Sequence, residues 1–435
     1  MKKLLLACII AMQTTTISAQ YGEVVGGDIS MIPQYEASNT IYLDGTGNVI
    51  PDLIPWLKNE CGWNAFRVRL FVNPTEPDAS SITGVVQDIN YVKALGKRIK
   101  DAGGKFLLDI HYSDTWADPV NQKLPASWAS CTTAQEKAEK VYSYTKETLQ
   151  TLKAAGATPD FVQVGNEITY GIVGIKVHPY DADGDDWTGF INVLKNGCKA
   201  VREECPEAKI IIHTERSGEY LRTQYFYKKL ASLDYDIIGL SYYPFYHNTL
   251  AYLISTLKTI ASDFPTKKVH IVETAYPIQW WPGDAKYDTR STWPVEEGKC
   301  DGQYAYTKDL IKTLASYPCV TGLYWWFPEE AGNGDSADWT NNTGIVISKW
   351  LNRGLWWPTS NNGHWPLKTS DGGVLWTMKT FLSPEAAGMT APETAGDNTT
   401  GNNRIYNIQG QYCGKDMSKL PKGIYIQNER KIINK

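Results

Sequence analysis

The chain alternates between short, continuously apolar runs and longer stretches in which apolar residues recur every three or four positions. The short runs are rich in Val, Ile, Leu, Phe and Tyr and mostly lack alternation with polar residues, which is typical of parallel strands buried on both faces. Eight of these runs are predicted as strands, at residues 23–30, 65–71, 105–111, 161–167, 209–215, 236–244, 268–277 and 320–329.

The longer stretches have the periodicity of amphipathic helices. Residues 88–104 carry apolar side chains at positions 89, 92, 95 and 99 and close on Gly103 and Gly104, which is a common end for a helix. Residues 133–156 have the same character and also end in glycine. Further helices are predicted at 186–205, 249–263 and 303–316.

Eight strands with helices between them most simply close into a (β/α)8 TIM barrel, an α/β fold. A doubly wound open sheet is the structural alternative. Such a sheet normally binds a nucleotide at a glycine-rich first turn, and neither G-x-G-x-x-G nor G-x-x-x-x-G-K-[ST] occurs here. We therefore expect the barrel.

The two ends of the chain differ from this pattern. Residues 1–19 combine two lysines, a short apolar run and a small-residue site near Ala19, which indicates a signal peptide rather than a lipoprotein leader cut at Cys8. Residues 383–404 are rich in Ser, Thr, Ala, Gly, Asn and Pro and are interpreted as a linker. Residues 405–435 form a short C-terminal tail with strand-like pieces, too small for a stable core of its own.

The composition excludes some classes of partner. The formal charge is −4 with no basic block, so nucleic acid and anionic membrane surfaces are not expected partners. No segment after the signal is apolar for long enough to cross a membrane. Aromatic residues make up 12% of the chain, which suits core packing and also a cleft that stacks sugar rings.

The eight cysteines are scattered and form no C-x-x-C pair, which speaks against a zinc site of that type. Export permits disulfides, and Cys300 with Cys319, or Cys198 with Cys205, are the candidate pairs. Most of the cysteines are expected to be buried thiols.

In a barrel of this kind the active site forms where the carboxyl ends of the strands meet the loops that follow them. A single strand end of this kind can simply lie in solvent, but here every predicted strand ends in a polar or aromatic group. These residues are Asp28, Arg69, His111, Asn166, Glu167, Glu215, Tyr242, Tyr243, Glu273, Trp325 and Trp326.

Two glutamates stand out in this set. Glu167 closes the fourth strand and Glu273 closes the seventh, so a barrel can bring them together across its mouth. Glycoside hydrolysis needs such a pair, because one carboxylic acid protonates the leaving oxygen while the other carboxylate attacks or activates water. Repulsion between them would keep one protonated near neutral pH. The alternative is a structural salt bridge with Arg67 or Arg69.

Other chemistries find less support. No G-x-S-x-G motif is present, and the six histidines are dispersed rather than clustered as a metal hydrolase requires. The acidic segments 181–186 and 283–288 offer oxygen ligands for calcium but do not match the twelve-residue calcium loop, and we expect solvated loops there.

Four segments together resemble glycoside hydrolase family 53, whose members are endo-β-1,4-galactanases acting on pectic (arabino)galactan. They are LLDIHYSDTWADPVNQKLPASW at 107–128, VQVGNEI at 162–168, GLSYYPFYHNTL at 239–250 and VETAYP at 272–277. The resemblance covers roughly residues 23–380. The H-Y-S-D-x-W-A-D-P string is specific, whereas the Asn-Glu pair is shared by a large clan of barrel glycosidases.

The resemblance implies a retaining, double-displacement mechanism with Glu167 as acid/base and Glu273 as nucleophile. Because strand alternation puts Tyr242 and Tyr243 on opposite faces, the sequence leaves open which of them faces the site. The residues that resemble those around the cleaved sugar are Arg69, His111, Asn166 and one of the two tyrosines. Those that resemble the lining of flanking subsites are Asp114, Trp116, Trp325 and Trp326.

The resemblance implies no cofactor for the chemistry. Some bacterial relatives carry a calcium loop after the seventh strand, with Asp, His and Asn, whereas residues 278–294 hold Asp284 and Asp288 but no His, which puts a structural calcium in doubt. That loop instead offers Trp280, Trp281 and Trp293 as sugar-stacking surface. The C-terminal tail resembles tails on exported proteins of the Bacteroidetes.

The sequence therefore predicts an exported monomer that is periplasmic, cell-surface or extracellular, with a catalytic domain at 20–382 that cuts internal β-1,4-galactosidic bonds. Two alternatives stay open. The barrel could hydrolyse another β-glycan, such as mannan or cellulose, or it could be a catalytically silent galactan-binding protein.

Overall fold

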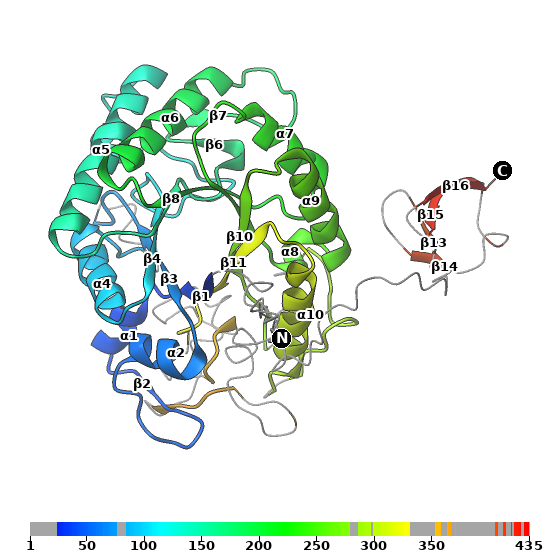
Figure 1. Ribbon diagram of the computed structural model, residues 1–435, viewed down its shortest axis with the longest axis horizontal. Coiled ribbons are helices and arrows are strands. Elements are labelled where there is room, and N and C mark those ends of the chain that lie inside the picture. The colour runs from blue at the N-terminus through cyan, green and yellow to red at the C-terminus, as the bar shows by residue number, and fades with distance from the viewer. Residues whose placement is uncertain are drawn as a thin grey trace, which may run out of the picture.

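A closed barrel of eight parallel strands forms the centre of the protein (Figure 1). The computed structural model describes residues 24–75, 84–278, 286–296, 299–330, 353–357, 363–367, 370, 405–407, 412–414, 419, 422–427 and 430–434. The strands are β1 (Val24–Asp28), β3 (Ala65–Leu70), β4 (Lys105–Ile110), β5 (Phe161–Val164), β8 (Lys209–Thr214), β9 (Ile237–Ser241), β10 (Lys268–Thr274) and β11 (Val320–Trp326). Their order around the ring follows the chain, and β1 closes it by pairing with both β3 and β11, so the predicted TIM barrel is confirmed.

Helices surround the ring of strands (Figure 1). They are α2 (Leu53–Cys61), α4 (Ile89–Asp101), α5 (Ala134–Ala154), α6 (Trp187–Glu204), α7 (Tyr220–Lys229), α9 (Leu250–Asp263) and α10 (Asp301–Ala315), with the short α1 (Ile32–Ala37) and α8 (Pro244–His247). The five predicted helices are confirmed, with each end within three residues of its predicted position. Two others, α2 and α7, escaped prediction because α2 is short and contains a proline, while α7 is dominated by tyrosine and charged residues.

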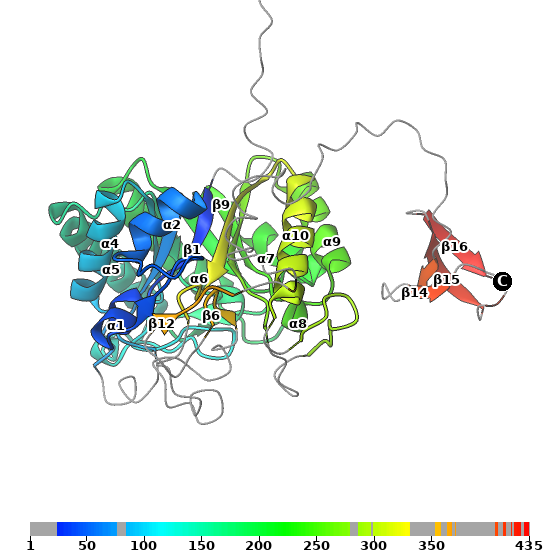
Figure 2. The same cartoon turned by 90° about the horizontal axis from the view of Figure 1, so that it is seen from below.

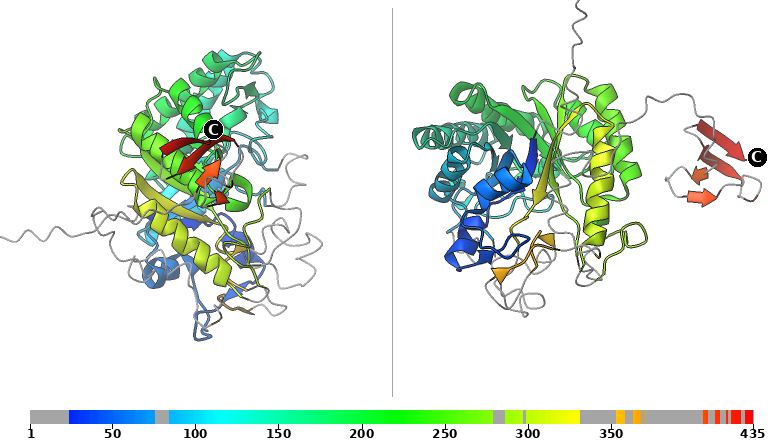
Figure 3. Two further views of the ribbon diagram at one scale, coloured as in Figure 1. Left: turned by 90° about the vertical axis from the view of Figure 1, so that its right-hand side faces the viewer. Right: turned by 60° about the horizontal axis from the view of Figure 1, so that its bottom comes forward.

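Smaller strands lie outside the barrel. β2 (Ile41–Tyr42) pairs with β12 (Gly363–His364), and β6 (Gly171–Ile172) pairs with β7 (Ile175–Lys176). Figure 2 shows β6, β12 and α8 at the same end of the barrel. The C-terminal tail forms a four-stranded antiparallel sheet in the order β14-β13-β15-β16, drawn in red in Figure 3. Its strands are β13 (Ile405–Asn407), β14 (Tyr412–Gly414), β15 (Gly423–Gln427) and β16 (Arg430–Asn434).

Several predictions fall on residues outside those described, namely the signal peptide at 1–19 and the linker at 383–404. Among the helices within the described ranges, none is both long enough and apolar enough to span a membrane. Neither candidate disulfide forms, because Cys198, Cys205 and Cys319 are all free thiols.

The inner face of the barrel is apolar at one end and polar further up. One apolar cluster inside the ring includes Val24, Ala65, Leu107, Phe161, Ile211, Ile237, Val272 and Tyr324. Side chains two positions apart on a strand share a face, so the next inward residues on four adjacent strands are Arg67, Asp109, Gln163 and His213, all buried. The outward residues, such as Phe66, Val68 and Leu108, pack in the large core under the helices. The strands are therefore apolar outside and carry a buried polar layer inside, directly below the active-site mouth.

Candidate active site

A cleft of about 520 Å³ opens at the carboxyl ends of the barrel strands. It collects residues that lie far apart in the sequence, which a parallel barrel does by placing all these strand ends at one rim. The predicted site residues that line it are Arg69, His111, Trp116, Asn166, Glu167, Tyr243, Glu273 and Trp326. Glu215, a strand end noted in the sequence without a role, also lines it.

Glu167 is presented to the cleft by an unusual backbone turn after β5. The strand ends at Val164, the next residue Gly165 has φ +86°, and Glu167 itself has φ 45° and ψ 49°, the left-handed region. This conformation costs a non-glycine residue about 1–2 kcal/mol and is often found at functional sites. The Glu167 N–H donates to His213 Nδ1 at 3.3 Å, and its carbonyl oxygen accepts from Gln122 Nε2 at 3.3 Å. The turn is thus held from both sides.

Glu273 is held by two donors from other elements, one on β3 and one after β9. It lies near the end of β10, where the pairing with β9 shifts register between Ile271 and Glu273. Its Oε1 forms an ion pair with Arg67 Nη2 at 2.9 Å, and its Oε2 accepts a hydrogen bond from Tyr243 Oη at 2.9 Å. Both carboxylate oxygens are therefore oriented before any substrate arrives.

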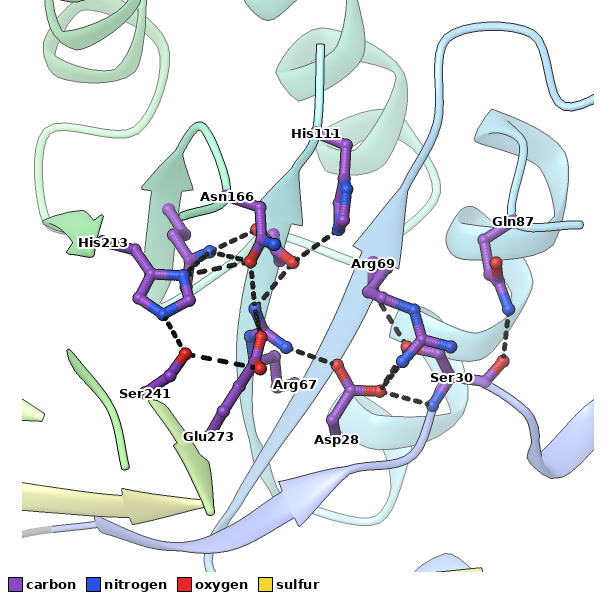
Figure 4. Close-up of polar contacts among 12 residues, drawn as sticks. Asp28, Ser30, Arg67, Arg69, Gln87, His111, Asn166, His213, Ser241 and Glu273 are labelled. Atoms are coloured by element: carbon purple, nitrogen blue, oxygen red, sulfur yellow. Dashed lines mark hydrogen bonds and ion pairs between the residues drawn. The ribbon is translucent and has the colours of Figure 1, made fainter. Parts of the chain in front are cut away.

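Arg67 is the centre of a buried polar network (Figure 4). Its side chain is fully buried, and Nη1 pairs with Asp28 Oδ2 at 2.8 Å while Nη2 pairs with Asp109 Oδ2 at 2.8 Å. Nη2 also donates to Asn166 Oδ1 at 2.8 Å. The network joins the ends of five strands, β1, β3, β4, β5 and β10, once the bond to Glu273 is included. The salt bridge weighed as an alternative to catalysis exists, and it is part of the site.

The electrostatics give the two glutamates different properties. Burial raises the pKa of Glu167, and the charges of Glu273 and Glu215 raise it further, well above the usual range for a glutamate. Burial also raises the pKa of Glu273, but the Arg67 guanidinium acts in the opposite direction. Glu167 therefore holds its proton to higher pH, while Glu273 has a cation that stabilises its charged form.

Ser241 sets an upper limit on the separation of the two carboxylates. Its Oγ lies 2.6 Å from Glu167 Oε1 and 3.4 Å from Glu273 Oε2. Those two carboxylate oxygens therefore lie at most about 6.0 Å apart, the sum of the two contacts. Retaining glycosidases have carboxyl groups about 5–5.5 Å apart and inverting ones about 6.5–9.5 Å. The limit is compatible with the retaining arrangement.

The structure selects one member from each of the two aromatic pairs. Tyr243 bonds Glu273, whereas Tyr242 points away from the cleft and donates its hydroxyl to a backbone carbonyl at 2.9 Å. Trp326 lines the cleft, whereas Trp325 is fully buried and donates its indole N–H to a backbone carbonyl at 3.0 Å. The assignments of Tyr242 and Trp325 to substrate contact are therefore corrected, and strand alternation is the cause.

Two other expected contacts are also absent from the cleft. Asp114 is buried, and its Oδ2 accepts from the backbone N–H of Ala126 at 2.7 Å, so it braces a loop rather than lining the described cleft. Trp293 is buried as well and donates its Nε1 proton to Asp309 at 2.8 Å, so it offers no stacking surface. Trp280 and Trp281 lie outside the described residues.

An aromatic wall flanks the glutamates on the side of β3 and β11. The Arg69 guanidinium carbon lies 4.8 Å from the Trp116 ring centre, 5.8 Å from Trp326 and 4.5 Å from Phe327. Arg69 Nη1 pairs with Asp28 at 2.6 Å, while its buried Nε and Nη2 make no hydrogen bond to any described residue. The flat faces of this wall suit stacking against a sugar ring.

The described residues do not fit a calcium site in the loop after β10. The Asp288 carboxylate accepts from Arg290 through both of its oxygens, at 2.9 Å and 3.1 Å from Nε. Asp284 lies outside the described residues. Among those described, no three His, Cys, Asp or Glu side chains are grouped to hold a metal ion.

Four functional residues were missed in the sequence: Asp109, Gln163, His213 and Ser241. The sequence did contain a signal, because polar residues stand two positions apart in otherwise apolar strands. The pairs are Arg67 and Arg69, Asp109 and His111, and His213 and Glu215. Polar residues repeated at this spacing mark the inner face of a barrel stave below its rim.

A (β/α)8 barrel with two facing glutamates, one in the turn after its fourth strand and one on its seventh strand, defines a glycoside hydrolase of the retaining type. Comparison with known proteins specifies the family. The sequence model of Glycosyl hydrolase family 53 matches residues 24–374, and the chain belongs to this family.

Individual relatives agree with this assignment. The chain is 32% identical to the endo-beta-1,4-galactanase of Bacillus subtilis (strain 168), over 70% of this chain and 70% of that protein. It is 35% identical to an uncharacterized protein of Niallia circulans, over 74% and 89% respectively. Among solved structures, the Ignisphaera aggregans GH53 catalytic domain is 27% identical with a TM-score of 0.69, over 82% of this chain and 95% of that one.

The raised pKa of Glu167 predicts how its removal changes stability with pH. In the folded state Glu167 keeps its proton at pH values where the unfolded chain has lost it, so its contribution to stability is present below the unfolded pKa and is lost as pH rises. Glu167→Gln stays neutral throughout. We expect the melting temperature of Glu167→Gln, relative to wild type, to rise between about pH 4 and pH 8.

The matched control is Glu207→Gln, which removes an exposed carboxylate from the surface. Thermal unfolding followed by circular dichroism measures both variants against wild type. A stability difference for Glu167→Gln that stays constant, or falls, as pH rises would contradict the assignment of the proton to this residue.

Proposed function

We propose that this family 53 enzyme hydrolyses internal β-1,4-galactosidic bonds of pectic (arabino)galactan, with Glu273 as nucleophile and Glu167 as acid/base. The observation that carries these roles is the asymmetry of the pair. Glu273 is ion-paired to Arg67, whereas Glu167 faces Glu273 and Glu215 and forms no ion pair within the described part of the chain.

The first half of the reaction forms a covalent intermediate. A Glu273 carboxylate oxygen attacks the anomeric carbon, the bond from that carbon to the bridging oxygen breaks, and Glu167 gives its proton to the bridging oxygen. The leaving chain departs with a free hydroxyl, and the galactosyl unit remains as an ester of Glu273. Arg67 and Tyr243, which hold the two Glu273 oxygens, keep the carboxylate aimed at the sugar.

The second half releases the sugar. Glu167, now ionised, takes a proton from a water molecule, whose oxygen attacks the anomeric carbon and breaks the ester to Glu273. Two inversions at the same carbon give a product with the original β configuration. The proton balance closes, because Glu167 regains the proton it lost and Glu273 returns to its ionised form.

The substrate proposal rests on the family and on the cleft. The Bacillus subtilis relative is an endo-beta-1,4-galactanase, and the wall of Trp116, Arg69 and Trp326 provides stacking faces next to the glutamates. The silent-binder alternative is disfavoured, because both carboxylates are present and only Glu273 is paired with a cation that favours its ionised form.

Replacing either glutamate should separate their roles. Glu273→Ala is expected to lower kcat on β-1,4-galactan by about 10⁴-fold or more, as loss of a covalent nucleophile does elsewhere. Glu167→Ala should lower it by about 10²–10⁴-fold, the usual contribution of an acid or base. Reducing-end release measures the activity of both variants. The control is Glu215→Gln, which removes another carboxyl group in the cleft and should lower kcat less than either substitution. Near wild-type activity in Glu273→Ala would exclude it as nucleophile.

The substrate is tested by a panel of polymers. We expect wild type to release reducing ends from pectic galactan at least about tenfold faster than from mannan or cellulose, the order of discrimination that a few misplaced hydroxyl contacts give. Proton NMR of the first products should show the β anomer. Preferred cleavage of another β-glycan would show that the enzyme is a hydrolase for that polymer. Galactan binding with no bond cleavage would show that the protein is a catalytically silent galactan-binding protein.

We also infer that the chain is exported and acts as a monomer. The support for export is the leader-like composition of residues 1–19. Expressed in its native type of host, the protein recovered outside the cytoplasm should begin at Gln20, as read by N-terminal sequencing, and should elute at the monomer mass in gel filtration. Full-length protein confined to the cytoplasm would contradict export.

A further inference from the structure

Ser241 lies at a junction between the two glutamates and a buried histidine. It is the last residue of β9 and is fully buried. Its Oγ lies 2.6 Å from Glu167 Oε1 and 2.8 Å from His213 Nε2. Figure 4 shows its hydroxyl placed between His213 and Glu273. Nothing in the double-displacement scheme above uses this hydroxyl or this imidazole.

The surroundings of His213 decide which of its nitrogens carries the proton. Nδ1 faces the backbone N–H of Glu167 at 3.3 Å and the Gln163 side-chain nitrogen at 3.1 Å, and both are donors. Asn166 Oδ1 is also 3.0 Å away, but it already accepts from Arg67 at 2.8 Å. A proton on Nδ1 would leave the Glu167 N–H facing another donor. Nδ1 therefore accepts, and the proton is on Nε2.

The direction of the next hydrogen bond follows. With its proton on Nε2, His213 donates to Ser241 Oγ, and the single Ser241 proton must go elsewhere. Glu167 Oε1 is 2.6 Å away, whereas Glu273 Oε2 is 3.4 Å away and already accepts from Tyr243 at 2.9 Å. Ser241 therefore donates to Glu167 Oε1.

We propose that Ser241, fixed by His213, is a positioning residue for the acid/base Glu167 and selects the oxygen that carries the catalytic proton. Because Oε1 accepts the Ser241 hydroxyl, the proton of the neutral acid resides on Oε2, the oxygen left for the leaving group. In the second half-reaction the same bond stabilises the ionised carboxylate. This inference rests on the roles given to Glu167 and Glu273 above.

The groups around Glu167 define what the bond must offset. Several charged and titratable groups face Glu167 from neighbouring elements. His213 lies on β8 and Glu215 follows it, Tyr243 follows β9, and Glu273 lies on β10. The loops that line the cleft add Asp118, Lys123 and His247. Burial and the three carboxylates favour the protonated form of Glu167, whereas a hydroxyl donor favours its ionised form. Loss of the Ser241 hydroxyl should therefore keep Glu167 protonated to higher pH.

The test compares two substrates that differ in their need for an acid. Galactan has a poor leaving group, while a nitrophenyl β-galactobioside has a leaving group that departs without a proton. For Ser241→Ala we expect kcat/KM on galactan to fall about 10–100-fold, the value of a hydrogen bond to a charged group. On the nitrophenyl substrate it should change by less than about threefold, because that step bypasses the acid. The alkaline limb of the galactan pH profile should move to higher pH.

Three further variants make the result specific. Ser241→Thr keeps a hydroxyl and should restore both the galactan rate and the pH profile. Ser241→Cys keeps the volume with a weak donor, and it should repeat the alanine pattern if Ser241→Ala does not fold. Ser217→Ala is the matched control, because Ser217 is a buried serine whose Oγ bonds the Ser241 carbonyl oxygen and neither carboxylate. It should show no dependence on the leaving group.

Two results would overturn the proposal. One is an equal loss on both substrates in folded Ser241→Ala, which would mean that Ser241 acts through Glu273 or through packing. The other is an unmoved alkaline limb. Failure of the proposed function is distinguishable, since it would show in wild type and in the glutamate variants. If another β-glycan proves to be the substrate, the same comparison applies with that polymer.

Discussion

The buried guanidinium of Arg67 is the interaction on which the site depends. A cation removed from water is very costly unless it is paired, and Arg67 forms ion pairs with Asp28, Asp109 and Glu273 at 2.8–2.9 Å. These partners come from three other strands, so the ion pairs also fix the relative positions of the strand ends. The catalytic carboxylate of Glu273 is thus one of the counter-ions that stabilise the buried Arg67 cation inside the barrel.

This arrangement also divides the chemistry between two identical side chains. Glu273 is ion-paired to Arg67, while Glu167 lies near Glu273 and Glu215 and forms no ion pair with any described residue, so the first is the better nucleophile and the second the better acid. The two glutamates have the same side chain, so their different roles come from the surroundings that the barrel gives each of them. This division requires the polar layer inside the barrel, which in turn requires the apolar layer beneath it to exclude water.

The barrel could be predicted because its signal is repeated along the chain, and the two glutamates because they end apolar strands. The sequence could not decide between Tyr242 and Tyr243, or between Trp325 and Trp326, since a shift of one residue in where a strand ends exchanges the inward and outward faces. Arg67 was noted only as a possible salt bridge, and Asp109 and His213 were overlooked, because their value depends on partners from other strands. Short α2 and aromatic α7 lacked a clear period.

A neutral group is the only kind that can hold Glu167 through both halves of the reaction. A lysine or arginine at the place of Ser241 would stabilise the carboxylate so strongly that it could no longer donate a proton, and another carboxylate would prevent it from ionising. A hydroxyl held by a neutral imidazole supports either state with a small bias toward the ionised one. His213 stays neutral because it is fully buried and lies near Arg67, which lower its pKa well below the usual value. The same cation that favours the ionised form of the nucleophile Glu273 thereby helps to keep His213, which supports the acid, uncharged.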